Sequence, residues 1–456
     1  MNLTDFQSLG LPARLTGPLA AAGFTQPTKI QSQAIPLVLD GQDVMGIAQT
    51  GSGKTAAFGL PILAGIMALE ERPKPRTTHA LILAPTRELA VQIDDSLRKY
   101  AGPKSRLQTV LLLGGVSRHH QIKRLERGMD VVIATPGRLK DLMDDNKIRL
   151  AGTKWLVLDE ADRMLDMGFV VPVRHIVKAI GAERQTMMFS ATMAPEVADL
   201  AKTLLRDPVR VEAAAAGSTV TRIDQRVILA PTKAKRGVLN DLLASDEDPM
   251  DRVIVFSRTK HGADRVAKNL AADGHRAAAI HGNKSQNARQ AALRDFAKGA
   301  VRILVATDIA ARGIDVPGIT HVINYELPDD PENYVHRIGR TGRNGASGTA
   351  ITLCDGAERR KLRDVERLVK LTLPLSGDPG VASDTGGGEP RNVRRNKPAR
   401  GRAHNDNRAP GGAGEAPAGR DGERKPARTR PANGRSFGQK KRGFVNKKGA
   451  KTARSA

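Results

Sequence analysis

Short apolar runs recur along the first half of the chain, separated by longer stretches in which apolar residues return every three or four positions. An apolar run without polar alternation is typical of a strand buried on both faces, and the longer pattern is typical of an amphipathic helix. Strands that alternate with helices predict a parallel sheet joined by right-handed crossovers. The predicted strands are residues 44–47, 80–83, 109–113, 131–134, 155–158 and 187–189.

The same alternation returns after residues 213–221, which are small and polar and therefore typical of a linker. We expect the second half to form a similar sheet. Its predicted strands are residues 227–229, 253–256, 277–280, 303–305, 322–324 and 350–353.

From about Ser376 onward Gly, Pro, Arg, Asn and Ala dominate, and bulky apolar residues are almost absent. Such a segment cannot bury enough surface to offset the entropy of ordering it, so we expect a disordered tail. The predicted fold class is α/β, with two tandem domains that are each a mainly parallel sheet flanked by helices. The predicted boundaries are 1–212 for the first domain, 213–221 for the linker, 222–375 for the second domain and 376–456 for the tail.

Charge is unevenly distributed. The net charge is +25, and residues 391–456 hold +16 of it, with 20 Lys and Arg against 4 Asp and Glu. This asymmetry points to a polyanionic partner, although a tail that only keeps the protein in solution would look the same.

Membrane insertion and disulfide bonding are not expected. No apolar run approaches the ~18 residues that a membrane helix needs, and residues 1–10 lack a basic start followed by an apolar stretch. The single cysteine, Cys354, lies on an apolar run and reads as a packed small hydrophobe in a reducing compartment. We therefore expect a soluble, cytoplasmic protein.

A Gly-rich turn follows the first predicted strand. Gly51 and Gly53 let successive backbone amides face inward in front of a helix amino terminus, an arrangement that holds phosphates. Lys54 would reach the terminal phosphates, and the Thr55 hydroxyl would ligate Mg2+. The alternative is a Gly-rich loop without a ligand, and Ala48 stands where the simple pattern has glycine. The candidate nucleotide-binding residues here are Ala48, Gln49, Thr50, Gly51, Ser52, Gly53, Lys54 and Thr55.

Two acids, Asp159 and Glu160, follow the buried strand at 155–158. Ligands of open α/β sheets bind beyond the carboxyl ends of the strands, so both acids should project into a crevice. The alternative is that they only cap the next helix. Combined with a phosphate loop, Asp159 becomes a candidate Mg2+ ligand, and Glu160 becomes the group that orients and deprotonates an attacking water.

Residues 159–162 read Asp-Glu-Ala-Asp, and with the Gly-Lys-Thr loop the chain resembles the DEAD-box RNA helicases. The short amino-terminal flank and basic tail are similar to those of the bacterial RhlE-like group. The resemblance implies two tandem RecA-like domains, ATP and Mg2+ as cofactors, and RNA as the partner. Gln31 has an amide that can read the edge of adenine, and it matches the Q motif of this family, with Phe6 upstream as a ring that could stack on the base.

In the first half, the resemblance also implies residues that contact the RNA backbone and residues that couple the ATP site to the RNA-binding face. Small residues, hydroxyls and guanidinium groups at strand ends suit a sugar-phosphate backbone. The implied RNA contacts are Pro85, Thr86, Arg87, Gly114, Gly115, Thr135 and Arg138. The implied coupling residues are Asp162, Ser190 and Thr192, although Ser190 and Thr192 could equally cap the helix near Pro195.

In the second half, the resemblance implies residues that complete the site. Thr307 and Asp308 would face RNA, and Gly313 and Asp315 would lie near the ribose. Arginines recur at spacing three from Arg337, which on a helical turn aligns them. We assign Arg340 and Arg343 as arginine fingers, His336 and Arg337 as couplers or RNA contacts, and Gln286 and Arg289 as interface couplers. Asn283 replaces the aspartate that relatives commonly carry in His-Gly-Asp.

The function predicted by the resemblance is an ATP-dependent RNA helicase that melts short duplexes locally and remodels RNA–protein complexes, with ribosomal or RNA-decay assemblies as possible partners. Loops that bind the sugar-phosphate backbone do not indicate whether the substrate is RNA or DNA. A second class of function stays open, which is a basic RNA chaperone or annealing clamp whose nucleotide only times release.

Overall fold

The computed structural model describes residues 5–48, 51–212, 223–311, 314, 316–342 and 347–377. Several predicted features lie outside these residues: Gln49, Thr50, Gly313, Asp315, Arg343, the whole linker at 213–221 and the tail from residue 378. Within the described ranges, none of the helices is both long and apolar enough to cross a membrane.

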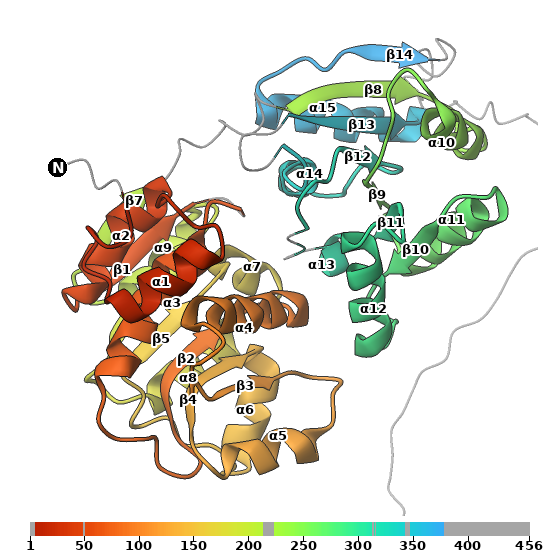
Figure 1. The fold of residues 1–456 in the computed structure, drawn as a ribbon. Helices are drawn as coiled ribbons and strands as arrows, with labels where there is room; N and C mark the ends of the chain where they lie inside the picture. Colours follow the sequence, from red (N-terminus) through yellow and green to blue (C-terminus); the bar gives the residue numbers. More distant parts are fainter. Residues whose placement is uncertain are drawn as a thin grey trace, which may run out of the picture. The chain divides into compact units, whose positions relative to one another are not determined.

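The first lobe is built on a seven-stranded sheet in which every described pairing is parallel (Figure 1). Its strand order is β3-β4-β2-β5-β6-β1-β7. The strands are β1 (Val44–Ile47), β2 (Thr78–Leu83), β3 (Thr109–Leu112), β4 (Met129–Ala134), β5 (Trp155–Leu158), β6 (Gln185–Ser190) and β7 (Val209–Glu212).

Helices cover both faces of this sheet, so its inner strands are buried on both sides as predicted. On β2, Ile82 joins the core cluster that contains Phe58 and Leu97, whereas Leu81 and Leu83 join the opposite cluster. The helices are α1 (Ala13–Ala21), α2 (Lys29–Leu39), α3 (Lys54–Ala68), α4 (Arg87–Ala101), α5 (Arg118–Leu125), α6 (Pro136–Asp144), α7 (Ala161–Asp166), α8 (Val170–Ala179) and α9 (Pro195–Leu204).

The second lobe repeats this plan with a parallel sheet of order β10-β11-β9-β12-β13-β8-β14. Its strands are β8 (Ile223–Leu229), β9 (Val253–Phe256), β10 (Ala277–Ile280), β11 (Ile303–Ala306), β12 (His321–Asn324), β13 (Gly348–Cys354) and β14 (Leu375–Gly377). Its helices are α10 (Lys235–Ala244), α11 (Lys260–Ala272), α12 (Gln286–Ala297), α13 (Asp308–Ala311), α14 (Pro331–Ile338), a 3-10 turn (Gly356–Glu358) and α15 (Arg359–Val369).

The prediction of two α/β units with parallel sheets is confirmed, and every predicted strand is present. Two strands were not predicted, β7 and β14, and each forms one edge of its sheet. Edge strands are short and polar because one side faces solvent. In β7 only Val211 is buried, and in β14 all three residues are exposed. β14 includes Ser376 and Gly377, which the sequence assigned to the tail.

Candidate functional site

The Gly-rich loop joins β1 to α3 and begins the helix in a conformation that requires glycine. Gly51 and Gly53 have φ of 86° and 92°, in the left-handed region. A Cβ on Gly53 would lie 2.3 Å from the Gln31 Nε2 atom. Glycine at position 53 therefore makes room for the Gln31 side chain and permits a left-handed turn that can aim backbone amides at a phosphate.

Lys54 is the first residue of α3, and its side chain turns back into the loop. It is only 6% exposed, and its Nζ donates a hydrogen bond to the Ala48 carbonyl at 2.9 Å. Thr55 follows in the first turn of the helix and is half-buried. The two side chains predicted to meet phosphate and Mg2+ thus lie at the amino terminus of α3.

Asp159 and Glu160 leave the carboxyl end of β5, which is separated from β1 by β6 alone. Both are buried, at 2% and 3% exposure. Burial raises the pKa of Asp159 to about 6, and Lys54 opposes this rise, which sets the two groups within electrostatic reach. Glu160 occupies the N-cap position of α7, but its side chain makes no capping hydrogen bond. Glu160 therefore does not cap α7 with its side chain, whereas the Asp159 Oδ1 atom accepts a hydrogen bond from the Glu160 amide at 2.9 Å.

Arg163 lies against Glu160 and was not identified from the sequence. Its Nε is 3.6 Å from the Glu160 Oε2 atom, and the side chain is 2% exposed. Burial alone would raise the pKa of Glu160, but Arg163, Lys54, Arg340 and His336 together lower it below its ordinary value. A basic residue three positions after an acid on a helix was the available signal.

Asp162 binds the turn after β6. Its Oδ2 accepts hydrogen bonds from the Ala191 and Thr192 amides at 3.0 and 3.1 Å. Helix α9 is N-capped by Ala194 without a side-chain bond, so the alternative in which Ser190 or Thr192 caps it is wrong. The Ser190 hydroxyl is buried and has no hydrogen-bond partner among the described residues.

Gln31 ties helix α2 to the Gly-rich loop. Its Oε1 accepts from the Thr28 amide at 2.9 Å, and its Nε2 donates to the Gly53 carbonyl at 3.1 Å. The oxygen and the nitrogen of the Gln31 side chain, which was predicted to read adenine, thus both form hydrogen bonds with backbone groups of the protein itself. Phe6 is 5% exposed and packs in the core, so the ring expected to stack on a base offers little free surface here.

The predicted backbone-binding loops of the first lobe meet at one edge of the sheet. Thr86 caps α4 by accepting a hydrogen bond from the Leu89 amide. The Arg87 guanidinium lies against Gly115, where an added Cβ would be 2.3 Å from its Nη1. Gly115 also has φ of 68°, so two independent constraints require glycine at this position.

Arg138 extends this group of cations. Its Nη1 donates to the Val116 carbonyl at 3.3 Å, directly after the glycine pair. Burial lowers the pKa of Arg138, and the neighbouring Arg118 and Arg87 lower it further. Thr135 is the N-cap residue of the same helix, α6, and is buried. Three guanidinium groups therefore share one region beside Gly114 and Gly115.

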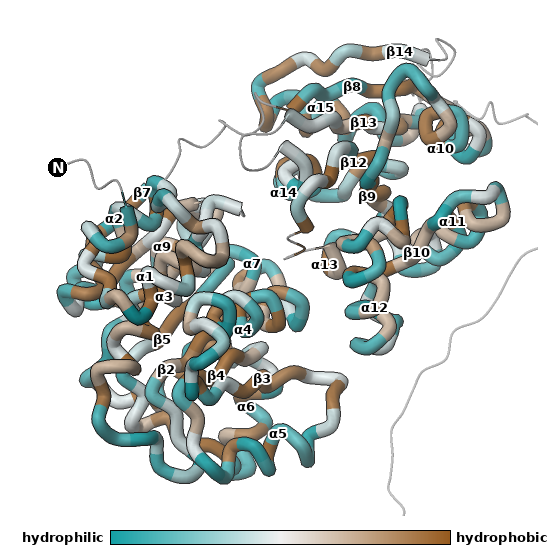
Figure 2. The backbone as a smooth tube through the Cα atoms, viewed as in Figure 1, coloured by the Kyte–Doolittle hydropathy of each residue, from teal (hydrophilic) through white to brown (hydrophobic). Residues whose placement is uncertain are grey.

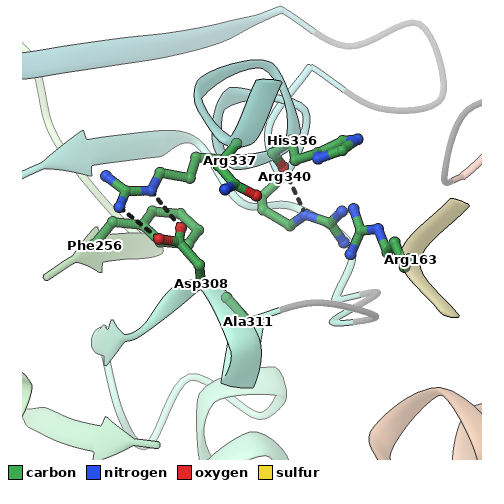
Figure 3. Close-up of a pocket in the computed structure, with 8 residues that line it drawn as sticks. Arg163, Phe256, Asp308, Ala311, His336, Arg337 and Arg340 are labelled. Atoms are coloured by element: carbon green, nitrogen blue, oxygen red, sulfur yellow. Dashed lines mark hydrogen bonds and ion pairs between the residues drawn. The ribbon is translucent and has the colours of Figure 1, made fainter. Parts of the chain in front are cut away.

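In the second lobe, Asp308 was expected to face RNA, but its carboxylate is paired with Arg337 instead. The Arg337 Nε and Nη2 donate to Asp308 at 2.5 and 2.8 Å, and the arginine side chain is 1% exposed (Figure 3). Arg337 also donates to the Asn324 side chain and the Glu326 carbonyl. These contacts join α13 and the end of β12 to α14, while Thr307 lies between β11 and α13.

We expected the arginines at spacing three to share one helix face. The structure shows that they do not. Helix α14 ends at Ile338 with Gly339 as its C-cap, so Arg340 lies beyond it. The Arg340 Nε and Nη1 donate to the carbonyls of His336 and Ile314 at 3.1 and 2.9 Å. Figure 3 shows the Arg340 guanidinium beside that of Arg163, and both line one pocket with His336 and Arg337.

Gln286 and Arg289, the predicted interface couplers, both bind Glu88 of α4. The Arg289 Nη2 lies 2.7 Å from one Glu88 oxygen, and the Gln286 Nε2 lies 3.2 Å from the other. Glu88 was not singled out from the sequence. Asn283 accepts a hydrogen bond from the Lys260 ammonium at 3.3 Å.

Comparison with known proteins identifies the family. The DEAD/DEAH box helicase model matches residues 28–200, and the helicase conserved C-terminal domain model matches residues 234–345. The DEAD-box ATP-dependent RNA helicase CshA of Geobacillus kaustophilus is 42% identical over 368 residues, covering 81% of this chain and 77% of that protein. The RNA helicase CrhR of Synechocystis sp. is 43% identical over 373 residues, covering 82% and 74%.

Among solved structures, S. cerevisiae Dbp5 bound to RNA and ADP BeF3 aligns with a TM-score of 0.73 and 29% identity, covering 84% of this chain and 98% of that one. The two sheets are thus tandem RecA-like domains, as the resemblance implied. The chain belongs to the DEAD-box family of ATP-dependent RNA helicases.

Proposed function

We propose that this chain hydrolyses ATP at the carboxyl edge of its first sheet and uses the cycle to melt short RNA duplexes and to remodel RNA–protein complexes. The observation that carries the proposal is the burial of Lys54, Asp159 and Glu160 at one sheet edge. Burying one cation and two acids is costly unless they serve a ligand or pair closely. Family membership supports ATP as that ligand.

Residues of the Gly-rich loop fit a nucleotide with Mg2+. The left-handed backbone at Gly51 and Gly53 lets amides turn toward a phosphate, and the buried Ser190 hydroxyl has no hydrogen-bond partner in the described part of the chain. Thr55 and Asp159 supply the hydroxyl and carboxylate oxygens that Mg2+ prefers. Mg2+ would neutralise charge on the phosphates when bound. Ala48, Gln49, Thr50, Gly51, Ser52 and Lys54 complete the phosphate site in this proposal.

Glu160 acts as the general base in this scheme, since it lies beyond β5 and the surrounding cations, Arg163 and Lys54 among them, lower its pKa and favour the carboxylate. Arg340 and Arg343 are assigned as fingers that stabilise charge on the transferred phosphoryl group. Gln31 reads adenine after exchanging its present partners, and Gly313 and Asp315 are assigned to the ribose. The pairing of Arg337 with Asp308 positions α14.

RNA is held mainly through its backbone. Pro85, Thr86, Arg87, Gly114, Gly115, Thr135 and Arg138 supply amides, hydroxyls and guanidinium groups on the first lobe, and Thr307 does so on the second. The relative Dbp5 has been solved with RNA bound, which supports RNA as the partner. Backbone contacts of this kind position a strand without reading its sequence.

We assign the coupling between ATP binding and RNA binding to hydrogen bonds that connect different helices and turns. Asp162 joins α7 to the turn that follows Ser190, and Glu88 joins α4 to Gln286 and Arg289. If RNA and ATP both favour the arrangement in which both lobes engage them, each ligand tightens binding of the other.

We further propose that the chain belongs to the RhlE-like group and acts in the cytoplasm, with ribosomal or RNA-decay assemblies as partners. The basic carboxyl-terminal composition supports attachment to such RNA-rich assemblies.

The deciding experiment is ATP turnover with and without single-stranded RNA. We expect RNA to stimulate the intact chain and Glu160→Gln to abolish nearly all turnover while ATP and RNA still bind. Glu183→Gln makes the same chemical change at an exposed position and should behave as the wild type. Turnover that does not respond to RNA would refute the proposal.

The annealing-clamp alternative gives a different result. Duplex remodelling would then survive Lys54→Ala and be lost on removal of the residues after Ser376. The buried set of Lys54, Asp159 and Glu160 favours the hydrolytic reading, because a passive clamp needs no general base.

A further inference from the structure

Helix α5 presents a basic surface that the proposed function does not use. Its eight residues, Arg-His-His-Gln-Ile-Lys-Arg-Leu, contain three Lys or Arg, two His and no acid. Gln121 and Leu125 face inward and are buried, while the charged side chains and both histidines are exposed.

The helix is held rigidly beside the proposed RNA-binding glycine pair. The Gln121 side chain accepts a hydrogen bond from the Leu113 amide at 3.1 Å and donates to the Leu113 carbonyl at 3.0 Å. Leu113 directly precedes Gly114. A two-point bond of this kind fixes the position of α5 relative to the loop, and Figure 1 shows α5 beside β3 and α6.

Folding explains part of the charge on α5, since Lys123 and Arg124 lie in its last turn, where the helix dipole favours cations, and Arg124 donates to the Thr109 carbonyl at 2.7 Å. Arg118 occupies the first helical position, where the helix dipole is positive and disfavours a cation. Arg118 recovers part of this by pairing with Asp145. Lys123 and Arg127 form no ion pair within the described residues. These two exposed cations can therefore meet an anionic ligand.

The surface is continuous with the guanidinium groups already assigned to RNA. Arg138 bonds to the Val116 carbonyl and feels the charge of both Arg87 and Arg118. From Arg118 the basic positions continue along α5 as His119, Lys123 and Arg127, which are spaced by four residues. Residues at this spacing lie on one side of a helix, and Arg127 follows just beyond its end. We call His119, Lys123 and Arg127 the α5 face.

We propose that the α5 face binds phosphates of the RNA strand beyond the nucleotides held by Gly115 and Arg138. This inference rests on the proposed function, since it extends the same RNA path. Eight helical residues span about 12 Å, long enough to follow the backbone of one strand past more than one phosphate. The face therefore enlarges the RNA footprint of the first lobe.

A protein partner fits this surface less well. Protein interfaces depend on aromatic or large apolar anchors at their centre. None of the exposed large apolar side chains in the described part of the chain belongs to α5, and the nearest in sequence is Val116. Polar cations without their own counterions suit a phosphate backbone.

The test uses Lys123→Ala/Arg127→Ala in the full chain. Binding of RNA of about six and about 14 nucleotides is measured across a salt series with a non-hydrolysable ATP analogue. We expect unchanged affinity for the short RNA, about tenfold weaker affinity for the long RNA, and a salt slope lower by about 1.4, because each phosphate contact contributes about 0.7 on single strands.

The matched control is Arg174→Ala/Lys178→Ala, which removes the same two charges at the same spacing from exposed positions on α8. Equal losses in both variants would indicate only a general field effect and would overturn the inference. No loss for the long RNA in the Lys123/Arg127 variant would do so as well. Stimulation of ATP turnover by the short RNA reports separately on the proposed function, so the two failures are distinguishable.

Discussion

Cys354 is the single cysteine of the chain, and its side chain is fully buried at the end of β13. Burial raises the pKa of its thiol to about 12, with nearby Glu358 adding to the rise. A thiol reacts with disulfide reagents as the thiolate, so burial and the raised pKa both suppress its reactivity.

We therefore predict that Cys354 does not react with an aromatic disulfide reagent in the folded protein at neutral pH. One thiol per chain should react after denaturation in urea. Rapid labelling under native conditions, at the rate of a free thiol, would show that β13 is not packed as described.

The residues that the sequence identified and those it missed are equally buried, and they differ in how their role is encoded. Lys54, Asp159 and Glu160 were found because they sit in short motifs of fixed spacing. Arg163 and Glu88 were not assigned, because their importance lies in partners rather than in a motif. The sequence also placed Asp308 toward RNA, since it could not show that Arg337 already neutralises it.

At the scale of elements, the sequence predicted what apolar periodicity can encode. Inner strands such as β9 were found with their observed ends, because they are apolar on both faces. The edge strands β7 and β14 were missed because solvent permits polar residues there. The end of α14 was also missed, since Gly339 stops the helix before Arg340 and the arginines therefore diverge.

The bond between α7 and the turn after β6 leads to a prediction at this scale. Asp162→Asn replaces a charged acceptor of the Ala191 and Thr192 amides with a neutral one. We expect ATP and RNA each to bind alone almost as before, while the factor by which one tightens the other falls about tenfold, within the usual 1–3 kcal/mol of coupling.

The measurement is a set of four binding titrations, with each ligand alone and in the presence of the other. Asp199→Asn makes the same change on exposed α9 and should leave the coupling intact. An unchanged coupling factor in Asp162→Asn would show that this link does not connect the two sites.

At the scale of the whole molecule, the catalytic set is divided between two sheets. Lys54, Asp159 and Glu160 belong to the first, whereas Arg340 belongs to the second. The field of Arg340 already reaches Glu160. Sequence spacing alone could not show this, because contacts between distant segments are set by the topology that brings strand ends together.

The central role assigned to the second lobe is to supply Arg340 as an arginine finger. Single-turnover ATP hydrolysis with saturating single-stranded RNA should be about 10³-fold slower in Arg340→Ala than in the wild type, with ATP and RNA still bound. Arg265→Ala, an exposed arginine on α11, should hydrolyse ATP normally. Hydrolysis in Arg340→Ala within about threefold of the wild-type rate would contradict the account.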